Sequence, residues 1–115
     1  MCSKLYHRAL RFIVQGQAIR LDPACDFSGL VAGSVGYLHA EFQLDSAWNG
    51  CRVAASFWQG RNEHAALLRN GACLIPAEAL TAKLFGVSLT GMRQDYRITT
   101  NRIYIEQEVL NNGNG

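Results

Sequence analysis

Three features of the sequence predict an all-β protein, folded as an antiparallel β-sandwich of about eight short strands. Short runs of apolar, β-branched and aromatic residues recur along the chain, separated by Gly, Asn and Asp. Residues 37–44 alternate strictly between polar and apolar side chains, as a strand with one buried face does. Asn70-Gly71 is the dipeptide that favours a type I′ hairpin turn.

The first two predicted strands are residues 10–14 and 18–21, joined by a turn at Gln15-Gly16. Asp22-Pro23 ends this hairpin, because proline lacks the backbone N–H that a strand must donate. A glycine-rich loop over residues 26–36 follows and leads into the alternating strand 37–44.

Residues 45–50 form the next predicted turn, and residues 52–58 the next strand. Residues 64–69 and 72–75 are predicted to be the two arms of a hairpin around Asn70-Gly71. Residues 76–83 are the one helical candidate, with proline in the first turn and Ala, Glu and Leu after it. A helix of two turns needs tertiary packing to be stable.

Three further strands are predicted at residues 84–89, 95–100 and 102–107. We therefore expect one β-sandwich domain over residues 1–110, since a chain of 115 residues is too short for two ordinary cores. Residues 111–115, which are Asn and Gly only, are expected to be a flexible tail.

The composition is that of a globular protein with little charge on its surface. Hydrophobic residues make up 49% of the chain and charged residues 17%, so some apolar surface is expected to remain for a partner. The net charge is only +2 and the basic residues are scattered, whereas nucleic-acid binding needs concentrated positive charge. The chain shows neither a secretory signal peptide nor an apolar segment of membrane-spanning length. We thus expect synthesis in the cytoplasm and no nucleic-acid or membrane partner.

The residue types that carry chemistry form no recognised motif. Cys2, Cys25, Cys51 and Cys73 include no C-x-x-C pair, so a zinc or iron–sulfur site is not predicted, and buried cysteines acting as small hydrophobes are. Whether any two of them are oxidised to a disulfide stays open.

His7, His39 and His64 belong to no catalytic sequence pattern. Glu106 and Glu108 share a strand face and could bind a cation, but near the end of a strand they are more typical of a solvated face. The glycine-rich loop leads into a strand, whereas a phosphate-binding loop leads into a helix. No enzymatic activity and no cofactor are therefore predicted.

Four aromatic residues are the candidates for contact with a ligand or partner: Trp48, Trp58, Tyr37 and Tyr104. Exposed Trp and Tyr rings can stack on sugar rings, which makes a carbohydrate-recognition module one hypothesis. The competing interpretation has Trp48 anchoring its turn to the core and Trp58 packing across strands. The sequence favours the competing interpretation.

An ordered set of residues from Tyr37 onward resembles a small β-sandwich module of baseplate and tail-fibre proteins in tailed phages and prophages of Gram-positive bacteria. The matching positions, within residues 28–107, are Phe42, Asp45, Trp48, Gly50, Phe57, Asn70, Gly71, Cys73, Ile75, Pro76, Glu78, Leu80, Gly91, Thr99, Thr100 and Asn101. Many such proteins continue into a long fibre region, and this sequence does not. A shortened chain and a stand-alone small protein both stay open.

The resemblance implies a non-enzymatic virion module that acts by self-association, as a homo-oligomer, or by docking to another virion protein. Burial of an apolar and aromatic patch and pairing of edge strands would provide the binding energy. Two alternatives stay open: recognition of host-surface carbohydrate, and a small phage-encoded protein that binds a host factor or small ligand.

Overall fold

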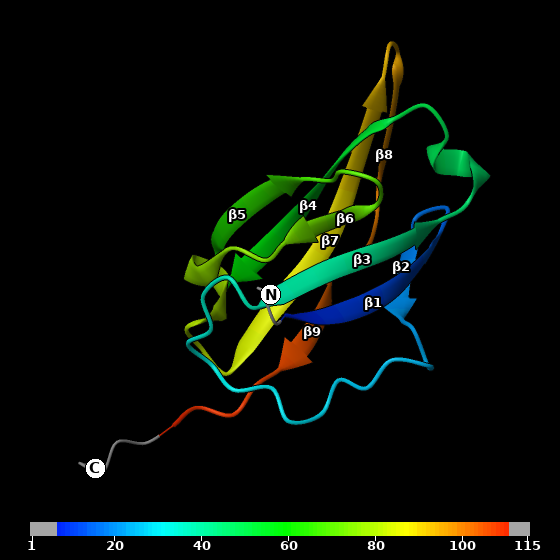
Figure 1. The fold of residues 1–115 in the computed structure, drawn as a ribbon. Coiled ribbons are helices and arrows are strands. Elements are labelled where there is room, and N and C mark those ends of the chain that lie inside the picture. Colours follow the sequence, from blue (N-terminus) through cyan, green and yellow to red (C-terminus); the bar gives the residue numbers. More distant parts are fainter. Residues whose placement is uncertain (1–6, 111–115) are drawn as a thin grey trace, which may run out of the picture.

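The computed structural model describes residues 7–110, which form two β-sheets packed face to face (Figure 1). The predicted all-β sandwich is confirmed. The strands are β1 (Arg8–Gln15), β2 (Ala18–Leu21), β3 (Leu38–Leu44), β4 (Arg52–Gln59), β5 (Asn62–Leu67), β6 (Ala72–Leu74), β7 (Leu84–Arg93), β8 (Tyr96–Thr99) and β9 (Ile103–Glu106). One sheet has the order β2-β1-β3-β6, and the other the order β5-β4-β7-β8, with β9 also paired to β7.

One strand pair departs from the expected antiparallel arrangement. β1 and β2 form the predicted hairpin, but β1 pairs with β3 in parallel, from Arg8 opposite Leu38 to Val14 opposite Leu44. A parallel pair requires a long connection that returns the chain to the starting end of the sheet. The loop between β2 and β3, drawn in cyan in Figure 1, makes that return along the bottom of the molecule.

Asn70-Gly71 forms the predicted turn, although its two arms enter different sheets. Both residues have positive φ, 53° and 77°, as a type I′ turn requires. Arg69 and Ala72 exchange backbone hydrogen bonds of 2.9 and 3.1 Å across it. Beyond this pair the arms separate, because β5 continues along β4 while β6 pairs with β3. The turn therefore carries the chain from one sheet to the other.

The predicted helix over 76–83 is shorter than expected, a 3₁₀ turn at Ala77–Leu80 (η2) with Pro76 at its N-cap. At the end of the turn the carbonyl of Leu80 accepts a 2.8 Å hydrogen bond from the N–H of Gly33, and that of Lys83 accepts one of 2.7 Å from the N–H of Gln107, so the chain is bonded to distant segments before β7 begins. A second 3₁₀ turn, Ser46–Trp48 (η1), lies in the predicted turn 45–50.

β7 is the longest strand and has two partners end to end along one edge. Its first half pairs with β9, from Leu84 to Val87, and its second half with β8, from Thr90 to Arg93. Thr100, between β8 and β9, spans the break: its N–H donates to Leu89 O and its Oγ1 accepts from Leu89 N–H, both at 3.0 Å. The backbone hydrogen bonding of β7 is thereby completed by a side chain.

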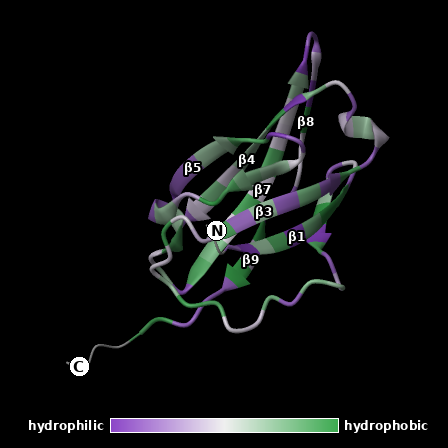
Figure 2. Cartoon of the chain, viewed as in Figure 1, coloured by the Kyte–Doolittle hydropathy of each residue, from purple (hydrophilic) through white to green (hydrophobic). Residues whose placement is uncertain are grey.

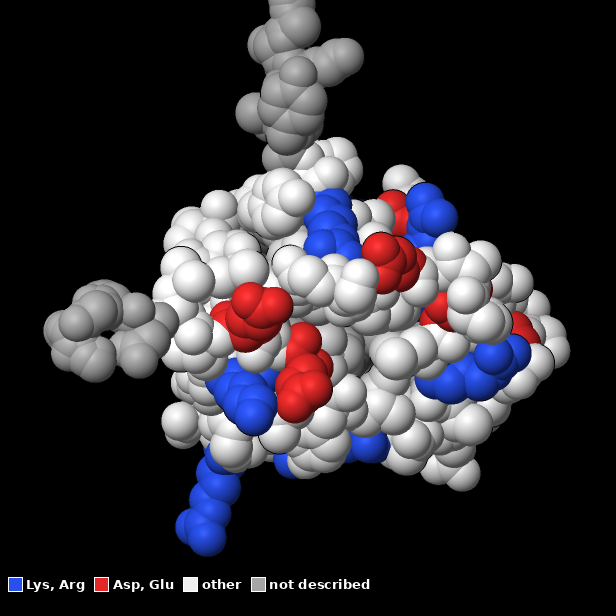
Figure 3. Space-filling view, turned by 90° about the horizontal axis from the view of Figure 1, so that it is seen from below, with Lys and Arg blue, Asp and Glu red and all other residues white. Residues whose placement is uncertain are grey.

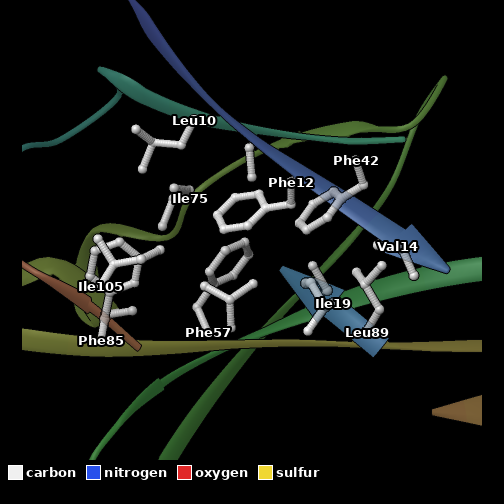
Figure 4. Packing of buried hydrophobic residues seen from close by; sticks show 14 of the residues in the cluster. Leu10, Phe12, Val14, Ile19, Phe42, Phe57, Ile75, Phe85, Leu89 and Ile105 are labelled. Atoms are coloured by element: carbon white, nitrogen blue, oxygen red, sulfur yellow. The ribbon is translucent and has the colours of Figure 1, made fainter. Parts of the chain in front are cut away.

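The core lies between the two sheets. Phe12 and Phe42 stack with ring centroids 5.0 Å apart, and Figure 4 shows Phe57 and Leu89 facing them from the other sheet. Figure 2 shows hydrophobic and hydrophilic residues alternating along strands such as β3, whose Leu38, Ala40 and Phe42 are buried. This alternation sorts each strand into a core face and an outer face.

Within residues 7–110, no helix has the length and apolar character needed to cross a membrane.

The Asn70-Gly71 turn makes a test of the fold. A Cβ on Gly71 would lie 3.2 Å from the carbonyl oxygen of Phe42 and would need a positive φ, so Gly71→Ala should lower the free energy of unfolding by about 2 kcal/mol. Gly60→Ala is the matched control, because Gly60 also has positive φ but open space around it; there a loss of about 1 kcal/mol is expected. Urea unfolding measures both, and equal losses would contradict a close approach of Gly71 to β3.

Candidate functional site

Trp48 is buried and belongs to the core. It is 3% exposed, and its indole N–H donates a 2.9 Å hydrogen bond to the carbonyl of Gly16 in the β1–β2 turn. The ring lies directly on β7 at Gly91, where a Cβ would come within 2.8 Å of two ring carbons. Trp48 is therefore unavailable to a ligand in this structure and anchors its turn, as the competing interpretation had it.

Trp58 lies on the outer face of the five-stranded sheet, half-buried by its neighbours. Its indole N–H donates to Ser88 Oγ on β7 at 3.1 Å. The guanidinium carbon of Arg102 lies 3.7 Å from the centroid of the Trp58 ring, a cation–π distance. Arg102 thus covers the ring, and a sugar could stack on that surface only if Arg102 moved away.

The two tyrosine candidates lie on different sheets. Tyr104, 56% exposed, lies two residues after Arg102 and in the same cross-strand row as Trp58, with Gly86 between them. Tyr37, 44% exposed, immediately precedes β3, and its carbonyl accepts the N–H of Arg8 at 2.9 Å. Of the four predicted residues, the structure therefore brings together only Trp58 and Tyr104. Arg102, which was not predicted, completes this group.

The outer face of the five-stranded sheet has few charges at its centre. By alternation with the buried residues of β4, β5, β7 and β8, its central outward positions are Ala54, Ser56, Ala65, Ser88, Thr90 and Thr99. One acidic residue reaches this centre: Glu63, opposite Trp58 on β5, accepts a hydrogen bond from Oγ of the buried Ser56. A hollow of about 530 Å³ lies at one end, with Ala54 and Thr90 lining it between Leu67 and Met92, and with Arg52, Arg93 and Gln94 at its polar side. Leu67 is 66% exposed and Met92 50% exposed. A large exposed apolar area of this kind is typical of an interaction surface.

The outer face of the four-stranded sheet differs in chemistry. Arg11 on β1 and Glu41 on β3 form a 3.1 Å ion pair across it. Arg20 on β2 is exposed and lies opposite Ile13 of β1. On the side of the molecule shown in Figure 3, acidic and basic side chains alternate and form no stripe of one sign. The outer face of the five-stranded sheet also carries charged residues, Arg52, Glu63, Arg97 and Glu106, around its small central side chains.

The carboxylate pair does not form a joint site. Glu106 is exposed and lies 3.9 Å from the ammonium of Lys83. Glu108 lies beyond β9, where its backbone N–H donates to Leu30 O and its carbonyl accepts from Ala32 N–H, both at 2.8 Å. Residues 7–110 contain no group of three His, Cys, Asp or Glu side chains placed to hold a metal ion.

Three of the four cysteines lie in the described part of the chain, and all three are free thiols of intermediate burial. Cys2 lies outside the described residues. Burial raises the pKa of the Cys73 thiol from 9.0 to about 12. The reactive thiolate of Cys73 is therefore disfavoured at neutral pH.

Comparisons of the chain with protein-family models, with curated proteins and with solved structures find no match.

Substitution of Gly91 tests the anchoring of Trp48. Gly91→Ala should lower the free energy of unfolding by about 2 kcal/mol, because the new methyl group would overlap a buried ring that cannot move away. Gly86→Ala is the matched control on the same strand, where the nearest atoms belong to the exposed, movable side chains of Arg102 and Tyr104; a loss below about 1 kcal/mol is expected. Denaturation followed by Trp fluorescence distinguishes them, and a harmless Gly91→Ala would contradict the anchor.

Cysteine alkylation tests the environment of Cys73. At pH 8 iodoacetamide should modify Cys25 and Cys51 of the folded protein well before Cys73, because the raised pKa of Cys73 leaves little thiolate at that pH. In denaturant all three should react at similar rates. Mass spectrometry of the labelled peptides gives the order, and equal rates in the folded protein would contradict it.

Proposed function

We propose that this chain is a non-enzymatic structural or attachment module of a tailed-phage virion, acting by self-association or by docking to another virion protein. The observation that carries the proposal is the ordered set of residues that resembles baseplate and tail-fibre modules. Several of these residues have a specific structural role here: Trp48 and Gly91 pack together, Gly71 closes the turn between the sheets, and Thr100 completes the edge of β7. Residues whose roles are to hold the fold together are what we expect of a structural protein.

The surface chemistry supports the same proposal. The central positions on the outer face of the five-stranded sheet are small and uncharged, and Leu67, Met92 and Tyr104 each expose half or more of their surface there. The centre of a protein interface is enriched in aromatic residues and Met, the types that Tyr104 and Met92 supply here, and its rim is polar. The proposed location is the virion, after synthesis in the cytoplasm of the bacterial host.

Recognition of carbohydrate is less well supported. It depends on exposed aromatic rings, but Trp48 is buried, the ring of Trp58 is covered by Arg102, and Tyr37 and Tyr104 are on separate sheets. No other observation favours the capture of a host factor or small ligand.

Particle association is the direct test. When tailed particles are induced in the host and purified by density gradient, the chain should be in the particle fractions and absent from matching fractions of an uninduced culture. Peptide mass spectrometry of the fractions, with antibody labelling of whole particles in the electron microscope, measures this. A host enzyme from the same cells is the control for contamination. Recovery of the chain only from the soluble fraction of lysed cells would overturn the proposal.

A further inference from the structure

The outer face of the five-stranded sheet consists of two dissimilar halves on either side of a row of small residues. Ser56 on β4 and Ser88 on β7 lie opposite each other in this row, beside Ala65 on β5. On one side lie the larger side chains of Glu63, Trp58 and Tyr104, with the guanidinium of Arg102 over the Trp58 ring. On the other side lies the hollow lined by Ala54 and Thr90. One half therefore has a shape that could fill the other.

The strand register allows this match to be followed residue by residue. A two-fold axis that lies across the strands at the Ser56–Ser88 row places each strand over the same strand of a second copy, with the direction reversed. On β4, Trp58 then faces Ala54, because each is one outward position from Ser56. On β7, by the same count from Ser88, Leu84 faces Met92. The Trp58 ring, with Arg102 over it, meets the hollow, and the two exposed apolar side chains meet each other. On β5, by the same count from Ala65, Glu63 faces Leu67.

The edge formed by β8 and β9 follows the same rule. Tyr104, in the row of Gly86, faces Thr99, which lies in the row of Thr90. Glu106, in the row of Leu84, faces Arg97, which lies in the row of Met92. The acid and the base belong to different ends of the sheet in one copy, so only reversal of the strand direction brings them together. Both pairs occur twice in a two-fold arrangement.

The other face-to-face orientation lacks this complementarity. An axis parallel to the strands would keep every row over itself, so the row of Trp58 and Tyr104 would meet its own copy. It would also bring Arg52 and Arg97, which share the row of Met92, over the same row of the partner. Repulsion between like charges opposes that orientation.

We propose that this outer face binds a second copy of the same chain, with the strands of the two sheets running in opposite directions. The inference deepens the proposed function, on whose self-association it rests. The dimer is a stack of two sheets, a packing that also forms the core of each sandwich. Arg97 of each copy pairs with Glu106 of the other at the rim, and Trp58 of each copy fills the hollow beside Ala54 of the other.

The size of the face indicates a reversible dimer. With strands about 4.8 Å apart and alternate residues about 6.8 Å apart, four strand positions and five rows cover roughly 20 by 30 Å. This is about 600 Å² in projection, below the ~800 Å² per partner of a standard stable interface. We therefore expect a dissociation constant in the micromolar range, on the order of 1–100 µM.

Charge reversal with the full chain tests the register of the dimer. Arg97→Glu and Glu106→Arg should each raise the dissociation constant tenfold or more, because each brings two like charges together twice. The double variant should restore it to within about threefold of the original, since the pair is then merely exchanged. Arg20→Glu, on the outer face of the other sheet, carries the same change of charge and should have no effect. Sedimentation equilibrium measures the constants, and circular dichroism confirms that each variant is folded.

A cysteine at the axis gives a second readout. Ala65→Cys places a thiol at an exposed position in the central row, where it faces its own counterpart across two sheets stacked about 10 Å apart. That separation exceeds the reach of a disulfide, so a short bismaleimide cross-linker should yield a covalent dimer. Arg20→Cys and the unaltered chain, which carry the same native cysteines, should remain monomeric on a non-reducing gel.

The outcomes separate this inference from the proposed function. A chain that is monomeric at millimolar concentration, or a dimer that ignores both charge reversals, overturns the proposed interface even if the chain is found in particles. A dimer that responds as described, in a chain absent from purified particles, supports the interface and overturns the virion proposal.

Discussion

The hydrogen bonds of Thr100 and Asn101 are the constraint on which the rest of the structure depends. Thr100 joins Leu89 on β7, while Asn101 Oδ1 accepts the N–H of Ile19 on β2 at 2.9 Å. The N–H of Asn101 also donates to the carbonyl of Gln17 at 3.1 Å. One short break between β8 and β9 thereby ties an edge of the first sheet to the second. Without it β2 would be an open edge, and the sandwich would be closed mainly at the β5–β6 side by the Asn70-Gly71 turn.

Each sheet has one outer face, and the two outer faces differ because a loop covers part of the first one only. The segment after β2 returns along the first sheet, where the N–H of Arg11 donates to Cys25 Sγ at 3.4 Å and the guanidinium of Arg8 donates to two loop carbonyls at 2.7 Å. The second sheet has no comparable cover among residues 7–110. Its central outward side chains are small, and the exposed apolar side chains of Leu67, Leu84 and Met92 lie around them, which leaves a surface that another sheet could cover.

Local patterns in the sequence predict the elements well, and their partners poorly. Alternation locates β3, and Asn70-Gly71 locates its turn, because both depend on neighbouring residues. The parallel pairing of β1 with β3, and the passage of the chain between sheets after β5, depend on which distant strands bury each other's apolar faces. Likewise Pro76 marks the start of a turn, but the carbonyl at its end, that of Leu80, is hydrogen-bonded by the N–H of the distant Gly33. Such long-range contacts leave no short-range signal.

The candidate site likewise combines residues that the sequence identifies with contacts that only the folded chain creates. Trp58 and Tyr104 are recognisable in the sequence as aromatic residues of strands, but their adjacency arises from the register of β4, β7 and β9, with Gly86 leaving room between them. The contact of Arg102 with Trp58 also arises from the strand register. Because the guanidinium of Arg102 covers the Trp58 ring, the ring is part of an amphipathic surface and is not an open platform for stacking. A face with large side chains in one half and a hollow in the other is more specific than a flat apolar patch. In the proposed dimer, shape and charge would select one orientation of the second copy, while the small side chains of the centre would supply part of the area.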